Sequence, residues 1–457
     1  MFDLPKWLLQ ITFLFVLFVS EAYVETNSQI PDLRTRKSGS DWPSFLGPTG
    51  DGKSPEKFPI EPWPISGPPL IWRTEIGKSY GAPTISRGRL FIFDRYQNLA
   101  RLSCMRSESK KLLWQFEYPT DYRDMYGYNN GPRTCPVVDS DRVYIYGPKG
   151  ILHCLNVLDG ALRWKIDISS QFNVVPNFFG VGSTPIIEDQ LLIVQVGGTL
   201  PTEARDVYQA QGKIAGNGSG IVAFNKISGQ VVYQITDELA SYASPILATI
   251  DQRRWCFMFT RGSLVGFNPL TGQIDFQYPW RDRKLESVNA SNPVVVGNTV
   301  FISEAYGVGS SVLQFYPKGY KIIWSDLLSR REKAMMLHWN TAIHHQGYLY
   351  GCSGRHTQGS SLRCVELQTG RVMWSKPINE RTSLLYINGY LISLGEFGRL
   401  MLIHVNPKAL DIISEVQLSR QHGLKHPLWA APVLSNGFLY IRSKDQLLCF
   451  DLTPSKN

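Results

Sequence analysis

Residues 342–374 read AIHHQGYLYGCSGRHTQGSSLRCVELQTGRVMW and alternate short apolar strands with glycine-containing turns. The first strand ends near His344, the second covers residues 348–352, the third covers residues 362–367, and the fourth ends at Trp374. Period-two alternation bounded by such turns predicts an antiparallel meander of four strands. One such sheet cannot bury both of its faces, so it requires neighbouring copies.

Equivalent copies occur along the chain at intervals of about 42 to 60 residues. The positions equivalent to Ala342 are Pro83, Pro136, Pro185, Pro245, Pro293, Leu384 and Pro432. A turn follows each position about five residues later, except in the copy at Pro245, for which we predict a longer turn.

The last copy, residues 432–452, ends before its fourth strand. The segment Leu70-Ile71-Trp72, near the other end of the chain, has the pattern of that missing strand. Pairing the two ends in one blade closes a ring and removes exposed sheet edges. The sequence therefore predicts an all-β fold, an eight-bladed β-propeller of four-stranded antiparallel blades whose last blade is closed by an N-terminal strand.

The chain before the ring divides into two predicted segments. Residues 1–22 are predicted to be a signal peptide, because Lys6 precedes an apolar run over residues 7–19 and Ser20-Glu21-Ala22 fits a cleavage site. An uncleaved anchor is the alternative. Residues 23–69 are predicted to be a Pro/Gly-rich linker and N-terminal arm, in which WPSFLGPTGDG (residues 42–52) docks at the first blade. Residues 70–453 would then form the propeller. We expect an exported protein, periplasmic or extracellular, with no transmembrane segment in the mature chain.

Charge and cysteine usage exclude two further classes of protein. The formal net charge is +9, but the basic residues are scattered without a run of five, so nucleic acid is not an expected partner. Cys104, Cys154, Cys364 and Cys449 share one place in the third strand of four blades, where other blades have Ala223 or Gly266. This column is a slot for small side chains whose members are too far apart to bridge, so we predict buried free thiols rather than a disulfide framework. The state of Cys135, Cys256 and Cys352 stays open.

The topology of a meander indicates where a site should lie. Loops that precede the first strand share one face with loops between the second and third strands, and the first strand lies nearest the axis. The insertions at residues 197–220, 304–309 and 353–359 fall on that face, and insertions confined to one face usually mark the binding face. The predicted ligand-binding residues at this channel mouth are Tyr80, Arg133, Tyr242, Asn289, Asn292, Glu304, His338, Trp339, Asn340, Arg355 and Trp429.

Each of these residue types also has a purely structural interpretation. Aromatic side chains such as Trp339 would stack on a planar or sugar-like ligand, or else wedge adjacent blades apart. The asparagines would hold a ligand or cation, or else bond the backbone of their own turns. Glu304 would reach the channel, or else pair with a neighbouring arginine such as Arg355. His338 would contact a ligand, or else be a satisfied polar group of the core.

The segment WPSFLGPTGDG, followed by repeats with Leu-x-Cys/Ala and Thr/Asp-Gly-x-x-x-Trp, resembles the bacterial secreted PQQ-like propellers, the pyrroloquinoline-quinone repeat superfamily. The resemblance covers residues 41–452. The sequence departs from the family pattern at Leu46, where Arg is more usual. The tryptophan column is also incomplete: Trp72, Trp114, Trp164, Trp324 and Trp374 keep it, Tyr233 and Phe276 replace it, and the seventh blade has no clear equivalent.

The resemblance implies two alternative functions. The superfamily contains quinoprotein alcohol dehydrogenases, which implies PQQ with a calcium site of Glu, Asn and Asp, an Asp base and a pair of adjacent cysteines. Glu304, Asn289, Asn292 and Asn340 would supply part of such a cation site, but the chain has no Cys-Cys pair and no C-x-x-C-H. The superfamily also contains non-enzymatic propellers such as an outer-membrane assembly scaffold.

The second alternative is the one that the sequence favours. No G-x-S-x-G, P-loop or H-E-x-x-H pattern occurs, so we assign no catalytic residue and no metal ligand. We expect a non-catalytic binding or scaffold module of the cell envelope, without a cofactor, that holds a protein, peptide or glycan on the channel-mouth face. A PQQ-dependent oxidoreductase with calcium remains the alternative.

Overall fold

The computed structural model describes residues 30–329 and 332–453. The predicted signal peptide lies outside the described residues. Within them, the two helices are single turns, α1 (Ile168–Gln171) and α2 (Leu418–His422). A search of the same residues finds no helix with the length and apolar character needed to cross a membrane.

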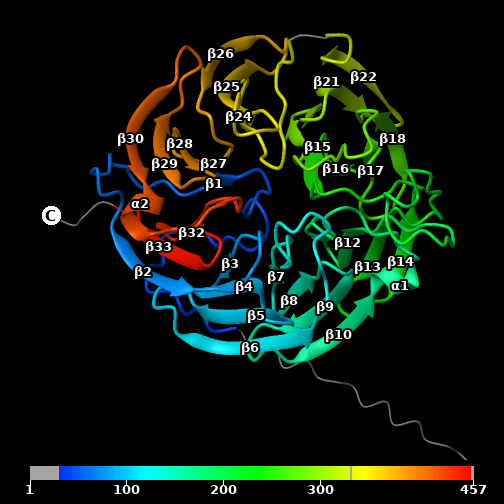
Figure 1. Ribbon diagram of the computed structural model, residues 1–457, viewed down its shortest axis with the longest axis horizontal. Coiled ribbons are helices and arrows are strands. Elements are labelled where there is room, and N and C mark those ends of the chain that lie inside the picture. The colour runs from blue at the N-terminus through cyan, green and yellow to red at the C-terminus, as the bar shows by residue number, and fades with distance from the viewer. Residues whose placement is uncertain (1–29, 330–331, 454–457) are drawn as a thin grey trace, which may run out of the picture. The chain divides into compact units, whose positions relative to one another are not determined.

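Eight four-stranded antiparallel sheets follow one another around a central axis, as the predicted propeller requires (Figure 1). The first blade is β3 (Thr84–Ser86), β4 (Arg89–Tyr96), β5 (Leu99–Arg106) and β6 (Leu112–Pro119); the second is β7 (Val137–Asp139), β8 (Arg142–Tyr146), β9 (Ile151–Asn156) and β10 (Leu162–Asp167). The third is β11 (Ile186–Glu188), β12 (Leu191–Gln195), β13 (Ile221–Asn225) and β14 (Val231–Ile235); the fourth is β15 (Ile246–Ile250), β16 (Arg253–Phe259), β17 (Ser263–Phe267) and β18 (Ile274–Pro279).

The later blades repeat the pattern. The fifth is β19 (Val294–Val296), β20 (Thr299–Glu304), β21 (Gly309–Tyr316) and β22 (Gly319–Ser325); the sixth is β23 (Ile343–His345), β24 (Tyr348–Ser353), β25 (Ser361–Glu366) and β26 (Val372–Pro377). The seventh is β27 (Thr382–Ile387), β28 (Tyr390–Gly395), β29 (Arg399–His404) and β30 (Asp411–Gln417). One detail of the prediction was wrong. The copy at Pro245 has a longer first strand instead of a longer turn, and its turn is the residue pair Asp251 and Gln252, both with positive φ.

The eighth blade joins the two ends of the chain, which confirms the predicted closure. It contains β31 (Val433–Ser435), β32 (Phe438–Arg442) and β33 (Gln446–Asp451), and its outer strand is β2 (Leu70–Glu75). Strand β2 pairs antiparallel with β33, with Trp72 opposite Cys449. The closing strand therefore comes from a segment more than 350 residues away in sequence.

The cysteine column and the tryptophan column face each other across the third and fourth strands. Cys104 lies opposite Trp114, and the same pairing joins Cys154 to Trp164 and Cys364 to Trp374. A small side chain leaves room for the facing aromatic ring, and Ala223 and Gly266 face Tyr233 and Phe276 in the same way. All seven cysteines are buried and unpaired, including Cys135, Cys256 and Cys352.

Each tryptophan of the column also joins its blade to the next one. The Trp114 Nε1 atom donates a hydrogen bond to the Val157 carbonyl at 2.9 Å, and a Cβ atom at Gly160 would lie 2.5 Å from the Trp114 ring. The glycine of the Asp-Gly turn is thus needed for the indole of the preceding blade to approach. In the seventh blade Ser414 occupies the equivalent place, so that blade has no such contact.

The N-terminal arm crosses several blades at the end of the first strands. Trp42 is 2% exposed and pairs with Ile85 of the first blade, while Pro43 accepts a hydrogen bond from the Val138 amide of the second. Strand β1 (Lys53–Ser54) pairs parallel with β27 of the seventh blade. The Glu56 carboxylate accepts hydrogen bonds from the Asn436 and Gly437 amides of the eighth. The arm therefore contacts several blades of the ring, whereas the sequence predicted that it docks at the first blade alone.

Candidate binding cavity at the channel mouth

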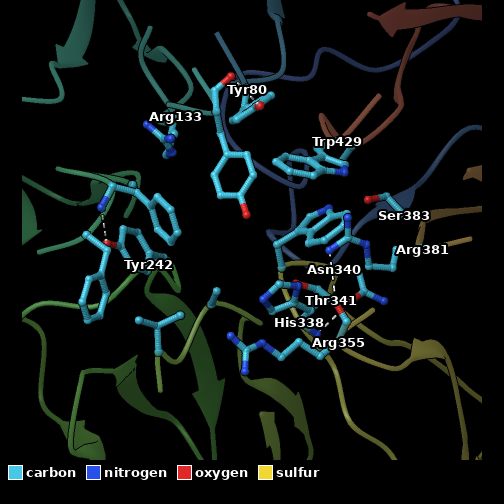
Figure 2. Close-up of a pocket in the computed structure, with 18 of the residues that line it drawn as sticks. Tyr80, Arg133, Tyr242, His338, Asn340, Thr341, Arg355, Arg381, Ser383 and Trp429 are labelled. Atoms are coloured by element: carbon cyan, nitrogen blue, oxygen red, sulfur yellow. Dashed lines mark hydrogen bonds between the residues drawn. The ribbon is translucent and has the colours of Figure 1, made fainter. Parts of the chain in front are cut away.

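The loops that precede the first strands meet around a cavity of about 680 Å³. Every blade contributes a residue to its wall, for example Tyr80, Tyr126, Phe178, Tyr242, Glu286, His338, Arg381 and Trp429 in chain order. Figure 2 shows Tyr80, Arg133, Tyr242 and Trp429 around a space shared with Arg355 and Arg381. A volume of this size is in the range of about 300–1,000 Å³ that is usual for small-ligand pockets.

The floor of the cavity comes from the arm. Phe45 and Leu46 line it, and they follow Trp42, which is held against the first strand of the first blade. A Cβ atom at Gly52 would lie 2.9 Å from the Ile343 side chain, so the arm also reaches the innermost strand of the sixth blade. The arm thus closes the central channel at the end opposite the loops.

One wall of the cavity is a series of aromatic rings in contact. The ring centres of Tyr80 and Trp429 are 4.8 Å apart, those of Trp429 and Trp339 are 4.9 Å apart, and those of Trp339 and His338 are 5.1 Å apart. The series ends at Tyr306, 5.7 Å from His338. These distances are typical of favourable tilted aromatic pairs, so the wall is a continuous series of packed rings inclined to one another by 46–66°.

The opposite wall is a second aromatic series. Tyr126 lies 6.1 Å from Tyr128 and 5.5 Å from Phe179, and Phe179 lies 5.5 Å from Tyr242. The Tyr242 hydroxyl accepts a hydrogen bond from the Phe179 amide at 2.8 Å, which fixes the relative position of these rings. The two walls meet where Tyr128 contacts Trp429 at 5.9 Å.

Arg381 is held between the aromatic wall and a buried carboxylate. Its guanidinium donates to both Glu396 oxygens, at 3.0 and 2.6 Å, and lies 4.4 Å from the Trp339 ring centre. Trp429 Nε1 donates to the same carboxylate at 2.9 Å. One buried anion therefore positions both an arginine and a tryptophan of the wall.

Two further arginines lie on the wall with different surroundings. Arg133 pairs with the fully buried Asp124 and stacks over Tyr80 and Phe179 at 5.4 and 5.3 Å. Arg355 stacks over Tyr306 at 4.1 Å, and among the described residues no carboxylate forms an ion pair with it. Its position is fixed through its backbone, because Arg381 donates to the Arg355 carbonyl at 3.1 Å.

Several polar atoms of the wall are buried without a partner among the residues that the structure describes. They are Arg133 Nη1, Trp339 Nε1 and His338 Nδ1. Burial, with the charges of Arg381 and Arg355, lowers the pKa of His338 to about 3, so its ring is neutral at physiological pH. Unpartnered buried polar groups cost free energy, and they are expected where a ligand completes the hydrogen bonds.

The structure brings most of the predicted site residues together. Those that line the cavity are Tyr80, Arg133, Tyr242, His338, Trp339, Asn340, Arg355 and Trp429. The Asn340 side chain also donates to the Cys352 carbonyl at 2.9 Å and accepts from the His338 amide at 3.1 Å, so it serves both its own turn and the wall.

The placement of Glu304, Asn289 and Asn292 on the cavity was wrong. The Glu304 carboxylate accepts hydrogen bonds from the Tyr306, Gly307 and Val308 amides at 2.8, 2.9 and 2.6 Å, and it does not pair with Arg355. Asn289 donates to the Thr260 and Trp280 carbonyls at 2.8 and 3.0 Å, and Asn292 accepts from the Ser244 amide at 2.8 Å. Backbone groups use these side chains, so the three residues are structural.

Other wall residues were not predicted from the sequence. They include Phe45, Phe178, Phe179, Tyr208, Glu286, Tyr306 and Arg381. Phe178 and Phe179 lie in a loop that precedes a first strand, and Tyr208 and Tyr306 lie in the insertions at residues 197–220 and 304–309, so all four are on the predicted face. Arg381 comes directly before β27, where the repeat register itself would have pointed to it.

The residues that would form a calcium and PQQ site do not meet. Asn289, Asn292 and Glu304 do not line the cavity, and Glu286 is the only carboxylate among the residues that do. A search of the described residues also finds no group of three or more His, Cys, Asp or Glu side chains placed to hold a metal ion. The donor set therefore does not fit the cation that PQQ enzymes use, which takes six to eight oxygen ligands.

A buried carboxyl beside the wall gives a pH-dependent prediction. Glu380 is 5% exposed, and burial raises its pKa to about 7. The folded protein therefore binds this proton more tightly than the unfolded chain, so the stability linked to it is present below about pH 4.5 and is lost as pH rises through 7. We expect Glu380→Gln to raise the free energy of unfolding at pH 8 by about 1–3 kcal/mol, with no gain at pH 4. Urea unfolding at both pH values checks this, and an equal gain at both would contradict it.

Comparison with known proteins supports the same architecture. A family model described as outer membrane protein assembly factor BamB matches residues 99–376, more than half of the chain. The curated outer membrane protein assembly factor BamB of Yersinia pestis is 20% identical over 313 residues, which cover 67% of this chain and 70% of that protein.

Solved structures show a likeness of fold at low sequence identity. BamB from Moraxella catarrhalis has a TM-score of 0.57 at 14% identity and covers 85% of this chain and 98% of that one. A computationally designed protein, Ika8, has a TM-score of 0.54 at 10% identity and covers 84% of this chain and 100% of that one. The family match confirms the resemblance seen in the repeats: this chain belongs to the PQQ-repeat propeller family described as outer membrane protein assembly factor BamB.

Proposed function

We propose that this protein is an exported, non-catalytic binding module of the cell envelope that holds its ligand in the channel-mouth cavity. The observation that carries the proposal is the pair of buried donors, Arg133 Nη1 and Trp339 Nε1, left without partners in an aromatic-walled cavity. A cavity wall with unused donors is suited to hold a ligand that supplies acceptors.

The envelope location is supported by the family and by the predicted signal peptide at residues 1–22. The relatives are named as outer membrane protein assembly factors, so a scaffold role beside other envelope proteins is consistent with membership. The rigid ring and its decorated face require no catalytic group for such a role.

The alternative function, a PQQ-dependent oxidoreductase, has less support. It needs a cation site and a general base beside the cofactor. The cavity wall contributes a single carboxylate, Glu286, and the asparagines and glutamate assigned to the cation are used by the backbone. We therefore derive no redox step for this protein.

Trp339→Ala tests the proposal, because Trp339 contacts both His338 and Trp429 and carries one of the unpartnered donors. The purified protein is incubated with an extract of the cell envelope, and retained peptides and glycans are identified by mass spectrometry after heat release. We expect the parent protein to retain a species that the variant retains at least tenfold less, as is typical of a buried aromatic contact. Tyr316→Ala is the matched control, because Tyr316 is 50% exposed at the end of β21. Equal retention by all three proteins would contradict the proposal.

A further inference from the structure

The unpartnered polar groups of the cavity wall are mainly hydrogen-bond donors. Arg133 Nη1 and Trp339 Nε1 can only donate. The Arg355 guanidinium, stacked on Tyr306, makes no ion pair or hydrogen bond within the described residues. A complementary ligand must therefore present acceptor oxygens at three separate places on the wall.

Arginine side chains make this wall a poor site for a cationic ligand. A ligand cation would be drawn to aromatic faces, but arginine side chains already cover those of Tyr306 and Trp339. Asp124 and Glu396 balance the charges of Arg133 and Arg381. Arg355 has no such partner in the part of the chain that the structure describes. Glu286, the carboxylate among the described residues that line the cavity, forms no ion pair with Arg355 either. The Arg355 guanidinium is therefore available to one carboxylate of the ligand.

The chemistry of the walls favours a sugar over a peptide. A peptide backbone brings as many N–H donors as carbonyl acceptors, whereas the buried wall atoms without a partner are mainly donors. A sugar hydroxyl can accept a hydrogen bond while the C–H face of its ring lies flat on an aromatic side chain. Hydroxyl-bearing rings line much of the cavity, from Tyr80, Tyr126, Tyr128, Tyr208, Tyr242 and Tyr306.

The arm determines which part of a sugar chain can enter. Phe45 and Leu46 close the cavity at the end opposite its mouth. A polymer cannot pass through such a cavity, so only the end of a chain can occupy it. The volume of about 680 Å³ suits a short terminal segment.

From these observations we infer that the cavity binds the terminal units of a uronic-acid glycan. The Arg355 guanidinium binds the ligand carboxylate, and Trp339 Nε1 and Arg133 Nη1 donate to its hydroxyl oxygens. The inference rests on the proposed function, since it names the ligand of the same cavity.

Calorimetric titration of the full-length mature protein tests the inference. The probes are the trisaccharides of galacturonate, mannuronate and guluronate, the neutral trisaccharide galactotriose, and the acidic peptide tri-aspartate. We expect at least one uronate trisaccharide to bind, and galactotriose and tri-aspartate to bind at least tenfold more weakly. Galactotriose lacks the carboxylate that makes the charged hydrogen bond, and tri-aspartate lacks the sugar ring that stacks on the aromatic wall.

Matched variants separate the contribution of the Arg355 charge from that of the Trp339 N–H donor. Arg355→Gln should weaken uronate binding by roughly tenfold and leave the weak galactotriose binding unchanged. Trp339→Phe, which keeps an aromatic ring and removes the donor, should weaken both sugars. Arg371→Gln makes the same charge change at an arginine side chain that is 65% exposed in the β25–β26 turn, and it should have no effect.

Three results would overturn the inference: equal binding of acidic and neutral trisaccharides, tighter binding of tri-aspartate, or no effect of Arg355→Gln. Failure of every uronate to bind would also overturn it. If Trp339→Ala nevertheless loses a species from the envelope extract, the proposed function stands and only the ligand class is wrong. If that retention is also unchanged, both fail.

Discussion

Replacing Trp72 with alanine should lower the free energy of unfolding by about 3–5 kcal/mol, as is usual for a buried aromatic side chain. Trp72 is 7% exposed and lies 6.0 Å from Tyr440 within the closing blade. Its Nε1 atom donates to the Ser107 carbonyl of the first blade at 3.1 Å. The same indole thus packs inside the eighth blade and joins that blade to the first. Its loss therefore weakens the seam, the contact between the eighth and first blades that closes the ring.

Two variants on the same strand separate the contributions. Trp72→Phe keeps most of the buried ring and should cost about 1 kcal/mol for the lost hydrogen bond, beyond the smaller loss of volume. Ile71→Ala changes a neighbour that is 45% exposed and should stay within about 0.5 kcal/mol of the parent. Urea denaturation followed by fluorescence and circular dichroism measures all three. A Trp72→Ala loss no larger than that of Ile71→Ala would show that the seam does not stabilise the ring.

Replacing Glu396 with alanine should also lower the free energy of unfolding by about 3–5 kcal/mol, because it leaves Arg381, whose side chain is 16% exposed, without its counter-ion. The Glu396 side chain is 3% exposed. It accepts hydrogen bonds from the Arg381 side chain, from the Arg381 amide at 3.0 Å and from Trp429 Nε1 at 2.9 Å. Without this carboxylate, Arg381 and Trp429 lose their position on the cavity wall. We therefore expect Glu396→Ala to lose the envelope ligand as well.

The pH dependence of this variant provides a second measurement. Burial raises the pKa of Glu396, but the hydrogen bonds from Arg381 and Trp429 outweigh burial and the net shift is downward. The pair therefore contributes stability above the unfolded pKa of about 4.3, and that contribution is lost as pH falls through the lower folded value. The difference between parent and variant should shrink in acid.

Glu415→Ala is the control for Glu396→Ala. It breaks an ion pair with Arg399 in which the glutamate side chain is 45% exposed, and it should cost about 0–1 kcal/mol. Chemical denaturation at pH 7 and pH 4 compares the two. Equal losses for Glu396→Ala and Glu415→Ala would contradict the positioning role of Glu396.

The fold could be predicted because its signals are local and repeated. Each first strand begins within two residues of the position taken from the repeat, from Thr84 after Pro83 to Val433 after Pro432. Alternation and turn residues act over a few positions, and repetition corrects local errors such as the turn after Pro245. The closure by β2 could be predicted because the last copy of the repeat lacked one strand.

The site was only partly predictable, because a loop's face is a property of topology but a side chain's direction is not. Glu304 and Trp339 were both assigned to the correct face. Glu304 turns back to three amides of its own loop, whereas Trp339 lies on the cavity wall. The choice depends on which backbone groups lack partners in the folded state, and the sequence does not contain that information.

The closed floor formed by Phe45 and Leu46 has a consequence for stoichiometry. A polymer that binds by one terminus can recruit one propeller per matching terminus, however long the polymer becomes. The amount of bound protein then reports the number of polymer chains in a sample and not their mass, and internal cleavage of the polymer by other enzymes would create new binding sites.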